Sequence, residues 1–74
     1  MDRFRLRDLR EDNDLNQDDV AEALHLTRTA LSNYEVGIRL PDIDLLIAIA
    51  NYFNVSLDYL VGRSNDSTPF SKDK

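Results

Sequence analysis

The 74-residue chain has no cysteine and no tryptophan, and only one histidine, two glycines and two prolines. Without cysteine, neither a disulfide nor a thiolate metal site can brace the fold, and one histidine cannot hold zinc alone. A chain this short buries only about 60% of its unfolded surface, so its stability rests on plain apolar packing. Such a core suits the reducing cytoplasm, where we expect the protein to act.

Long apolar runs are missing as well. No run approaches the roughly 20 residues needed to cross a bilayer, and the first ten residues, MDRFRLRDLR, lack the apolar core and cleavage site of a signal peptide. We therefore expect a soluble protein without membrane contact.

Residues that usually carry catalysis or bind metals show no usable arrangement. His25 has no nucleophile–base pattern near it in sequence, so we interpret it as a turn residue. The acidic run Asp12, Asp14, Asp18, Asp19 lacks the central glycine and closing glutamate of a calcium loop. The sequence predicts no enzyme, no cofactor and no metal site, and no small-molecule ligand is evident.

Apolar residues recur at helical spacing, and no segment alternates long enough for a strand. Five helices are expected: about 2–12, 17–24, 28–35, one between Asp42 and Asn54, and 57–61. Their predicted N-terminal caps are Asn16 (in a capping box with Asp19), Thr27, Asp42 and Ser56. The predicted stops include Gly37, Asn54 and Gly62.

The densest apolar stripe belongs to the fourth helix and is expected to face the core. Its members are Ile43, Leu46, Ile47, Ile49, Ala50 and Phe53. From Arg63 onward the composition turns to Ser, Asn, Asp, Thr, Pro and Lys. We therefore expect one folded domain over residues 1–63 and a polar, disordered tail over 64–74.

The second and third helical patterns are separated by only His25, Leu26 and Thr27, and small Ala21 sits where the helices would cross. This combination describes a helix-turn-helix, whose second helix lies in the major groove of DNA. The net charge of −5 limits the number of phosphates that the chain can contact, because phosphate binding needs a basic face. The arginines near the N-terminus and beside the third helix, opposite the acidic run 11–24, indicate a polarised surface.

These patterns carry a family resemblance. The matching segments are Leu9-Arg10, Leu15-Asn16-Gln17, Val20-Ala21, Leu31-Ser32, Asn33-Tyr34-Glu35, Gly37, Pro41 and residues 55–60. Over about Phe4 to Arg63 the chain resembles the lambda-repressor and Cro-like helix-turn-helix domains, the Xre family. The resemblance implies an all-α, compact five-helix fold with a central helix-turn-helix. His25 departs from the family's usual glycine at the turn, and we expect it to adopt a left-handed conformation.

Candidate DNA-binding residues lie around the third helix: Gln17, Thr27, Arg28, Thr29, Ser32, Asn33 and Arg39. Arg28 can donate two parallel bonds to guanine, Thr29 and Asn33 can also read base edges, and Ser32 shares their face. The resemblance implies phosphate contacts for Gln17 and Arg39, and a buried structural ion pair between Arg10 and Glu35. The alternative for each polar residue is an ordinary solvated surface.

The sequence thus predicts a small transcriptional regulator, a repressor, that binds double-stranded DNA with its third helix in the major groove. The resemblance adds a homodimer on a palindromic operator, through the end that holds helices four and five. Tyr52 and Tyr59 on these helices are expected either to pack in the core or to lie at this interface. A protein-interaction module with this fold, or the antitoxin of a toxin pair using residues 64–74 to fold on its partner, remains the alternative.

Overall fold

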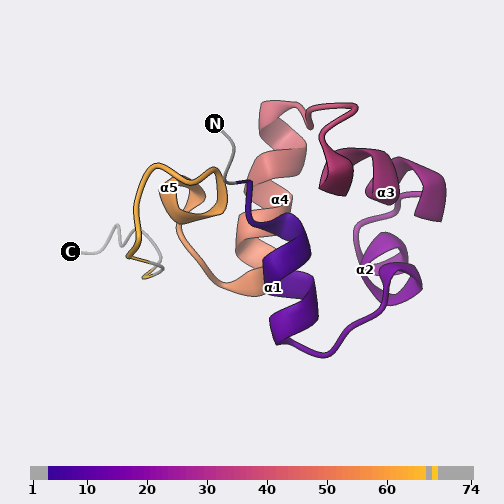
Figure 1. The fold of residues 1–74 in the computed structure, drawn as a ribbon, viewed down its shortest axis with the longest axis horizontal. Helices are drawn as coiled ribbons and strands as arrows, with labels where there is room; N and C mark the ends of the chain where they lie inside the picture. Colours follow the sequence, from indigo (N-terminus) through magenta and orange to yellow (C-terminus); the bar gives the residue numbers. More distant parts are fainter. Residues whose placement is uncertain (1–3, 67, 69–74) are drawn as a thin grey trace.

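The computed structural model describes residues 4–66 and Thr68. Its five helices are α1 (Leu6–Asp12), α2 (Gln17–Ala23), α3 (Arg28–Val36), α4 (Ile43–Phe53) and α5 (Leu57–Leu60). The residues described form no strand, so the all-α, five-helix prediction is confirmed. In Figure 1, α2 and α3 form one end of the molecule, α5 lies at the other, and α1 and α4 fill the space between them.

Local chemistry at the helix ends sets most of these boundaries. Each of the four predicted caps accepts the backbone N–H of the residue three positions after it, and Asn16 and Asp19 form the reciprocal capping box. Gly37 and Asn54 end α3 and α4 in the left-handed conformation, with φ of 89° and 57°. His25 also adopts positive φ, 60°, as expected for the turn between α2 and α3.

The first helix starts later than its sequence pattern predicts. We predicted a start near residue 2, but α1 begins at Leu6, and Phe4 and Arg5 are not helical. The backbone N–H of Arg5 instead donates to the Leu60 carbonyl at 2.8 Å, tying the start of the chain to α5. A long-range bond therefore replaces the first helical turn. The other boundaries agree with the prediction to within one residue.

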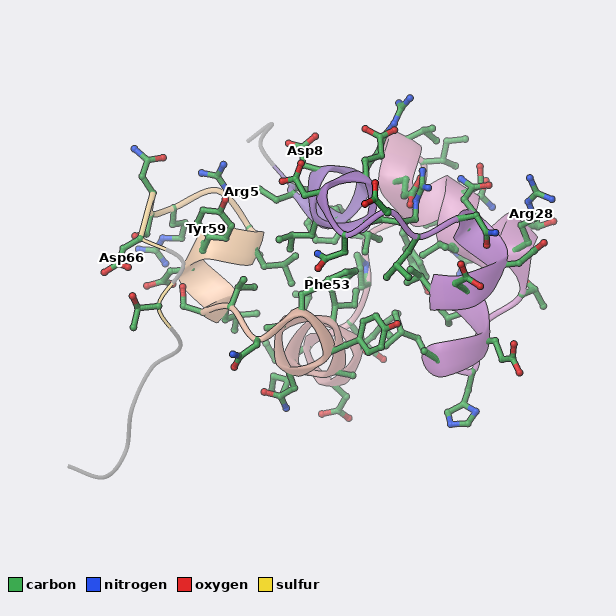
Figure 2. All side chains as sticks on the ribbon, turned by 90° about the horizontal axis from the view of Figure 1, so that it is seen from below. Arg5, Asp8, Arg28, Phe53, Tyr59 and Asp66 are labelled. Carbon is green, nitrogen blue, oxygen red and sulfur yellow. The ribbon has the colours of Figure 1, made fainter. Side chains whose placement is uncertain are left out.

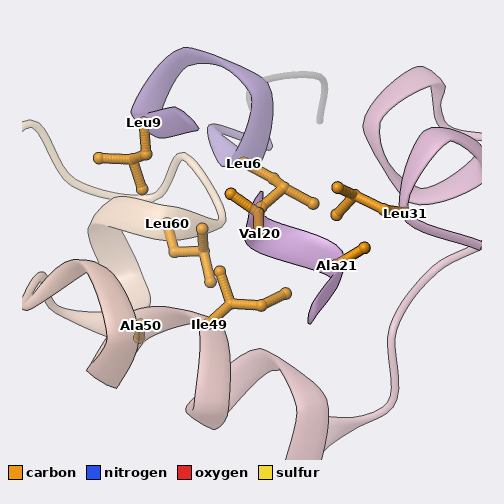
Figure 3. Close-up of a cluster of buried hydrophobic side chains, with 8 residues drawn as sticks. All are labelled: Leu6, Leu9, Val20, Ala21, Leu31, Ile49, Ala50 and Leu60. Atoms are coloured by element: carbon orange, nitrogen blue, oxygen red, sulfur yellow. The ribbon is translucent and has the colours of Figure 1, made fainter. Parts of the chain in front are cut away.

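Eight apolar side chains form the buried core, and Figure 3 shows them converging from all five helices. They are Leu6, Leu9, Val20, Ala21, Leu31, Ile49, Ala50 and Leu60. Ala21 of α2 is buried, α2 and α3 pack on each other, and α1 also packs on α3. The core therefore holds α2 and α3 together as one unit and fixes the orientation of this unit relative to the other helices.

One prediction about the core is wrong. Ile43 and Ile47 belong to the apolar stripe of α4, yet their side chains are 57% and 44% exposed. Ile49 and Ala50 are buried, while Leu46 and Phe53 are half-buried against them. The apolar stripe of α4 is therefore wider than the face that the other helices cover.

The start of the predicted polar tail makes contacts with the folded domain. The Arg5 guanidinium donates to the Ser64 carbonyl and the Asn65 side chain, and Ser56 Oγ donates to the Asp66 carbonyl at 3.2 Å. Two hydrogen bonds from Thr68, the stronger from its backbone N–H, lower the pKa of the Asp66 carboxyl. The disorder predicted for residues 67 and 69–74 falls outside the described residues.

Candidate nucleic-acid interface

The N-terminal end of α3 projects from the protein surface. Thr27 Oγ1 accepts the Ala30 N–H at 3.0 Å, which starts the helix and leaves Thr27, Arg28 and Thr29 exposed. In Figure 2, Arg28 extends from the end of the molecule opposite Tyr59 and Asp66. None of the other helices described covers this end, so it is accessible to a large partner.

Gln17 connects the start of α2 to both ends of α3. Its amide Nε2 donates to Glu35 Oε1 at 3.0 Å, and its Oε1 accepts from Arg28 Nε at 3.3 Å. The Arg28 guanidinium also lies 3.8 Å from the Asp18 carboxylate, with both side chains about two-thirds exposed. These contacts hold Arg28 beside the N-terminus of α2, where backbone N–H groups favour an anion.

Arg10 and Glu35 form an ion pair that joins α1 to α3. Arg10 Nε lies 2.6 Å from Glu35 Oε2, and Nη2 lies 3.3 Å from Oε1. The third nitrogen donates to the Leu15 carbonyl at 2.9 Å. The Glu35 side chain is only 2% exposed and that of Arg10 12%. The hydrogen bond to Glu35 raises the pKa of Arg10 above its ordinary value, so Arg10 stays charged.

The other end of α3 carries the remaining candidates. Ser32 and Asn33 are half-buried one turn after Thr29. The Asn33 carbonyl accepts from the N–H groups of both Ile38 and Arg39, at 3.0 and 3.3 Å. These two hydrogen bonds hold the loop after α3 against the end of the helix, and the Arg39 side chain remains exposed. The structure therefore places a cation at each end of α3.

Charge is unevenly distributed around this surface. Six exposed carboxylates lie on the α1–α2 side: Glu11, Asp12, Asp14, Asp18, Asp19 and Glu22. Within the part of the chain described, no group of three or more acidic or histidine side chains could hold a metal ion. The acidic side borders the candidate surface, so the usable basic area is small.

Two arginines make contacts that the sequence did not predict. Arg5 belongs to the arginines near the N-terminus that the sequence assigns to a polarised surface. In the structure its Nε donates to the Tyr59 carbonyl at 2.7 Å, and its guanidinium lies 4.1 Å above the Tyr59 ring. The pairing of Arg28 with Asp18 was also not predicted. The contacts of both arginines depend on how helices are placed relative to one another, which short-range sequence patterns do not predict.

Across the described residues, no helix is both long and apolar enough to span a membrane. The geometry is that of two short, tightly joined helices with the second one exposed at its start. A helix-turn-helix family model (HTH_3) matches residues 6–60, which covers all five helices. The chain belongs to the Xre-like helix-turn-helix family.

Relatives of this family member carry regulator names. The chain is 41% identical to the HTH-type transcriptional regulator ImmR of Bacillus subtilis, over 85% of this chain and 50% of ImmR. It is 45% identical to the uncharacterized HTH-type transcriptional regulator YqaE of the same organism, over 82% of this chain and 53% of YqaE.

A third relative is the cryptic phage CTXphi transcriptional repressor RstR of Vibrio cholerae, 32% identical over 81% of this chain and 54% of RstR. The chain thus spans about half the length of these curated relatives. No solved structure gives a significant match.

Proposed function

We propose that this helix-turn-helix chain binds double-stranded DNA sequence-specifically as part of a transcription regulator, with α3 in the major groove. The observation that carries the proposal is the exposed start of α3, where Gln17 and Arg28 meet at the N-terminus of α2. The names of the relatives, all transcription regulators, support it. They do not favour the alternatives of a protein-interaction module or an antitoxin. This function requires no catalysis, and its DNA target would place the protein in the cytoplasm.

We assign base reading to the exposed start and outer face of α3. Arg28 would turn from Gln17 and Asp18 to donate two bonds to guanine, a contact worth about 1–3 kcal/mol of discrimination. Thr29 would offer its hydroxyl or methyl group, and Asn33 would reach a base one turn further on. Ser32, half-buried on the same face, would contribute least.

We assign phosphate contacts to the two ends of α3. Gln17 and Thr27 stand at the N-termini of α2 and α3, where helix dipoles favour a phosphate. Arg39 would approach the DNA backbone at the other end. The Arg10–Glu35 pair would act indirectly, because it fixes α3 against α1 and touches no DNA. Such contacts set register, while base contacts set sequence preference.

We further propose that two copies bind a palindromic site and repress by blocking polymerase. A dimer would present two recognition helices to half-sites about 34 Å apart. RstR is named a transcriptional repressor, which supports repression. Another relative, BcrR of Enterococcus faecalis, is named a transcriptional activator.

Selection of bound duplexes from a random pool tests the proposal. We expect an enriched motif with two inverted half-sites, and repression of a reporter promoter that carries this motif. Recovery of no motif, together with no binding to random duplexes at low salt, would refute DNA binding.

A further inference from the structure

Two neighbouring carboxylates in the first turn of α2 have different partners. Asp19 serves the helix itself: its Oδ2 accepts the Asn16 N–H at 3.1 Å, and its own N–H donates to Asn16 Oδ1 at 2.8 Å. Asp18 takes no part in this capping box. Among the residues that the structure describes, the ionic partner of its carboxylate is Arg28, with Oδ2 3.8 Å from Nη1. The capping of α2 therefore does not require Asp18, and its partner belongs to the proposed recognition helix.

Gln17 presents a second acceptor to Arg28, and its orientation is fixed from the interior. The Glu35 carboxylate can only accept hydrogen bonds when ionised, so it binds the Gln17 amide nitrogen, Nε2, at 3.0 Å. The amide oxygen then points the other way and accepts from Arg28 Nε at 3.3 Å. Arg28 thus contacts two oxygen acceptors. One is neutral and held in place by Glu35, whereas the other is charged and belongs to a side chain that is 70% exposed.

Base reading by Arg28 requires these contacts to be exchanged for contacts with DNA. Guanine offers two acceptors, O6 and N7, in place of the two protein oxygens. The exchange leaves Asp18 as an unpaired negative charge. Asp18 directly follows Gln17, for which we propose a phosphate contact, and charges in about 0.1 M salt act on each other over roughly 10 Å. Asp18 therefore attracts Arg28 in the free chain and is repelled by phosphates in the complex.

We propose that Asp18 competes with DNA for Arg28 and so lowers the affinity of this domain for its site. The inference rests on the proposed function, because it assigns an autoinhibitory contact to the same surface. An exposed ion pair changes an equilibrium constant by at most a factor of about five. Repulsion between the unpaired carboxylate and the phosphates adds to this factor, and both effects weaken as the salt concentration rises. Asp18 would thus limit affinity without contacting DNA.

The test measures binding of the full chain to its selected duplex by fluorescence anisotropy in about 0.1 M salt. Asp18→Asn removes the charge and keeps the size of the side chain. The matched control is Glu22→Gln, which removes the same charge one turn further along α2, from an exposed side chain without an ion pair to any described residue. Both changes are repeated in Arg28→Ala chains, which have no guanidinium for Asp18 to hold. Circular dichroism checks that each variant is folded.

We expect Asp18→Asn to tighten binding by about 3- to 10-fold, and Glu22→Gln by less than about twofold. In Arg28→Ala chains the two changes should have the same effect to within about twofold, because the contact for which DNA competes is gone. Weaker binding of Asp18→Asn would overturn the proposal and make Asp18 a residue that positions Arg28 for the base. Equal gains from Asp18→Asn and Glu22→Gln would also overturn it, as would an undiminished gain from Asp18→Asn in Arg28→Ala chains.

Two further measurements separate failure of this proposal from failure of the proposed function. A wild type that binds neither the selected duplex nor random duplex at low salt would refute DNA binding, and the competition with it. The ion pair itself is tested without DNA, from the Nε resonance of Arg28 in the ¹⁵N-labelled free chain. Asp18→Asn should move this resonance more than Glu22→Gln does. Equal shifts would overturn the competition alone, because the free chain would then not hold the pair.

Discussion

Replacing Arg10 with methionine should remove most of the stability of the domain. The Glu35 carboxylate accepts bonds from Arg10 Nε and Nη2 and from Gln17 Nε2, and it is only 2% exposed. Among the residues that the structure describes, Arg10→Met leaves Gln17 as the sole partner of the Glu35 carboxylate and also removes the donor to the Leu15 carbonyl. Breaking a buried ion pair costs about 3–5 kcal/mol. Because Gln17 remains and Arg10 lies near the surface, we expect a loss of about 2–4 kcal/mol.

Urea unfolding followed by circular dichroism measures this loss. The matched control is Arg7→Met, which removes an exposed arginine with one i,i+4 partner, Glu11, and should cost at most about 0.5 kcal/mol. Arg10→Met/Glu35→Met should recover much of the loss, since apolar replacement of both partners is often neutral. If Arg10→Met is as stable as Arg7→Met, the pair does not fix α3 as argued. The same holds if Arg10→Met/Glu35→Met loses more free energy of unfolding than Arg10→Met and Glu35→Met lose together as single variants.

Three other predictions concern the turns and the DNA surface. His25→Gly should raise the free energy of unfolding by about 0.5–1 kcal/mol, and Gly37→Ala should lower it by about 1 kcal/mol, because both residues have positive φ, which glycine adopts without strain. A Cβ at Gly37 meets only open space, so the cost there comes from the backbone conformation alone. Changes of the opposite sign in urea unfolding would contradict this. Arg28→Ala should weaken binding to the selected duplex by about 1–3 kcal/mol and relax preference at one base pair, measured by fluorescence anisotropy on single-base variants; unchanged affinity would remove Arg28 from base reading. The slope of log K against log salt should be about −1 per chain, since Arg39 is the cation assigned to a phosphate and each phosphate contributes about −0.9; a slope steeper than about −4 would contradict the charge argument.

The helix boundaries were largely predictable because they depend on local chemistry. A cap such as Asn16 or Asp42 acts on backbone groups two or three residues away, so its effect can be read from the neighbouring sequence. The left-handed positions at His25 and Gly37 depend on the same short range. The helix-turn-helix arrangement followed from these boundaries and from the spacing of apolar residues.

Features that depend on distant neighbours were not predictable. The periodicity of α4 identifies apolar residues, but not which of them the other helices reach, so Ile43 and Ile47 were wrongly placed in the core. The late start of α1 depends on a bond between Arg5 and Leu60. At the candidate site, the pairing of Arg28 with Asp18 depends on how α2 and α3 cross. The roles of the candidate DNA-binding residues remain predictions.

Amide chemical-shift mapping with the selected duplex tests the central proposal most directly. The ¹⁵N-labelled chain should show its largest changes at Gln17, from Thr27 to Asn33, and at Arg39, with smaller changes over α5. Scrambled duplex at the same salt concentration is the control and should shift the same surface more weakly. Changes concentrated on α4 and α5, with Arg28 and its neighbours unmoved, would contradict the assignment of α3 as the recognition helix.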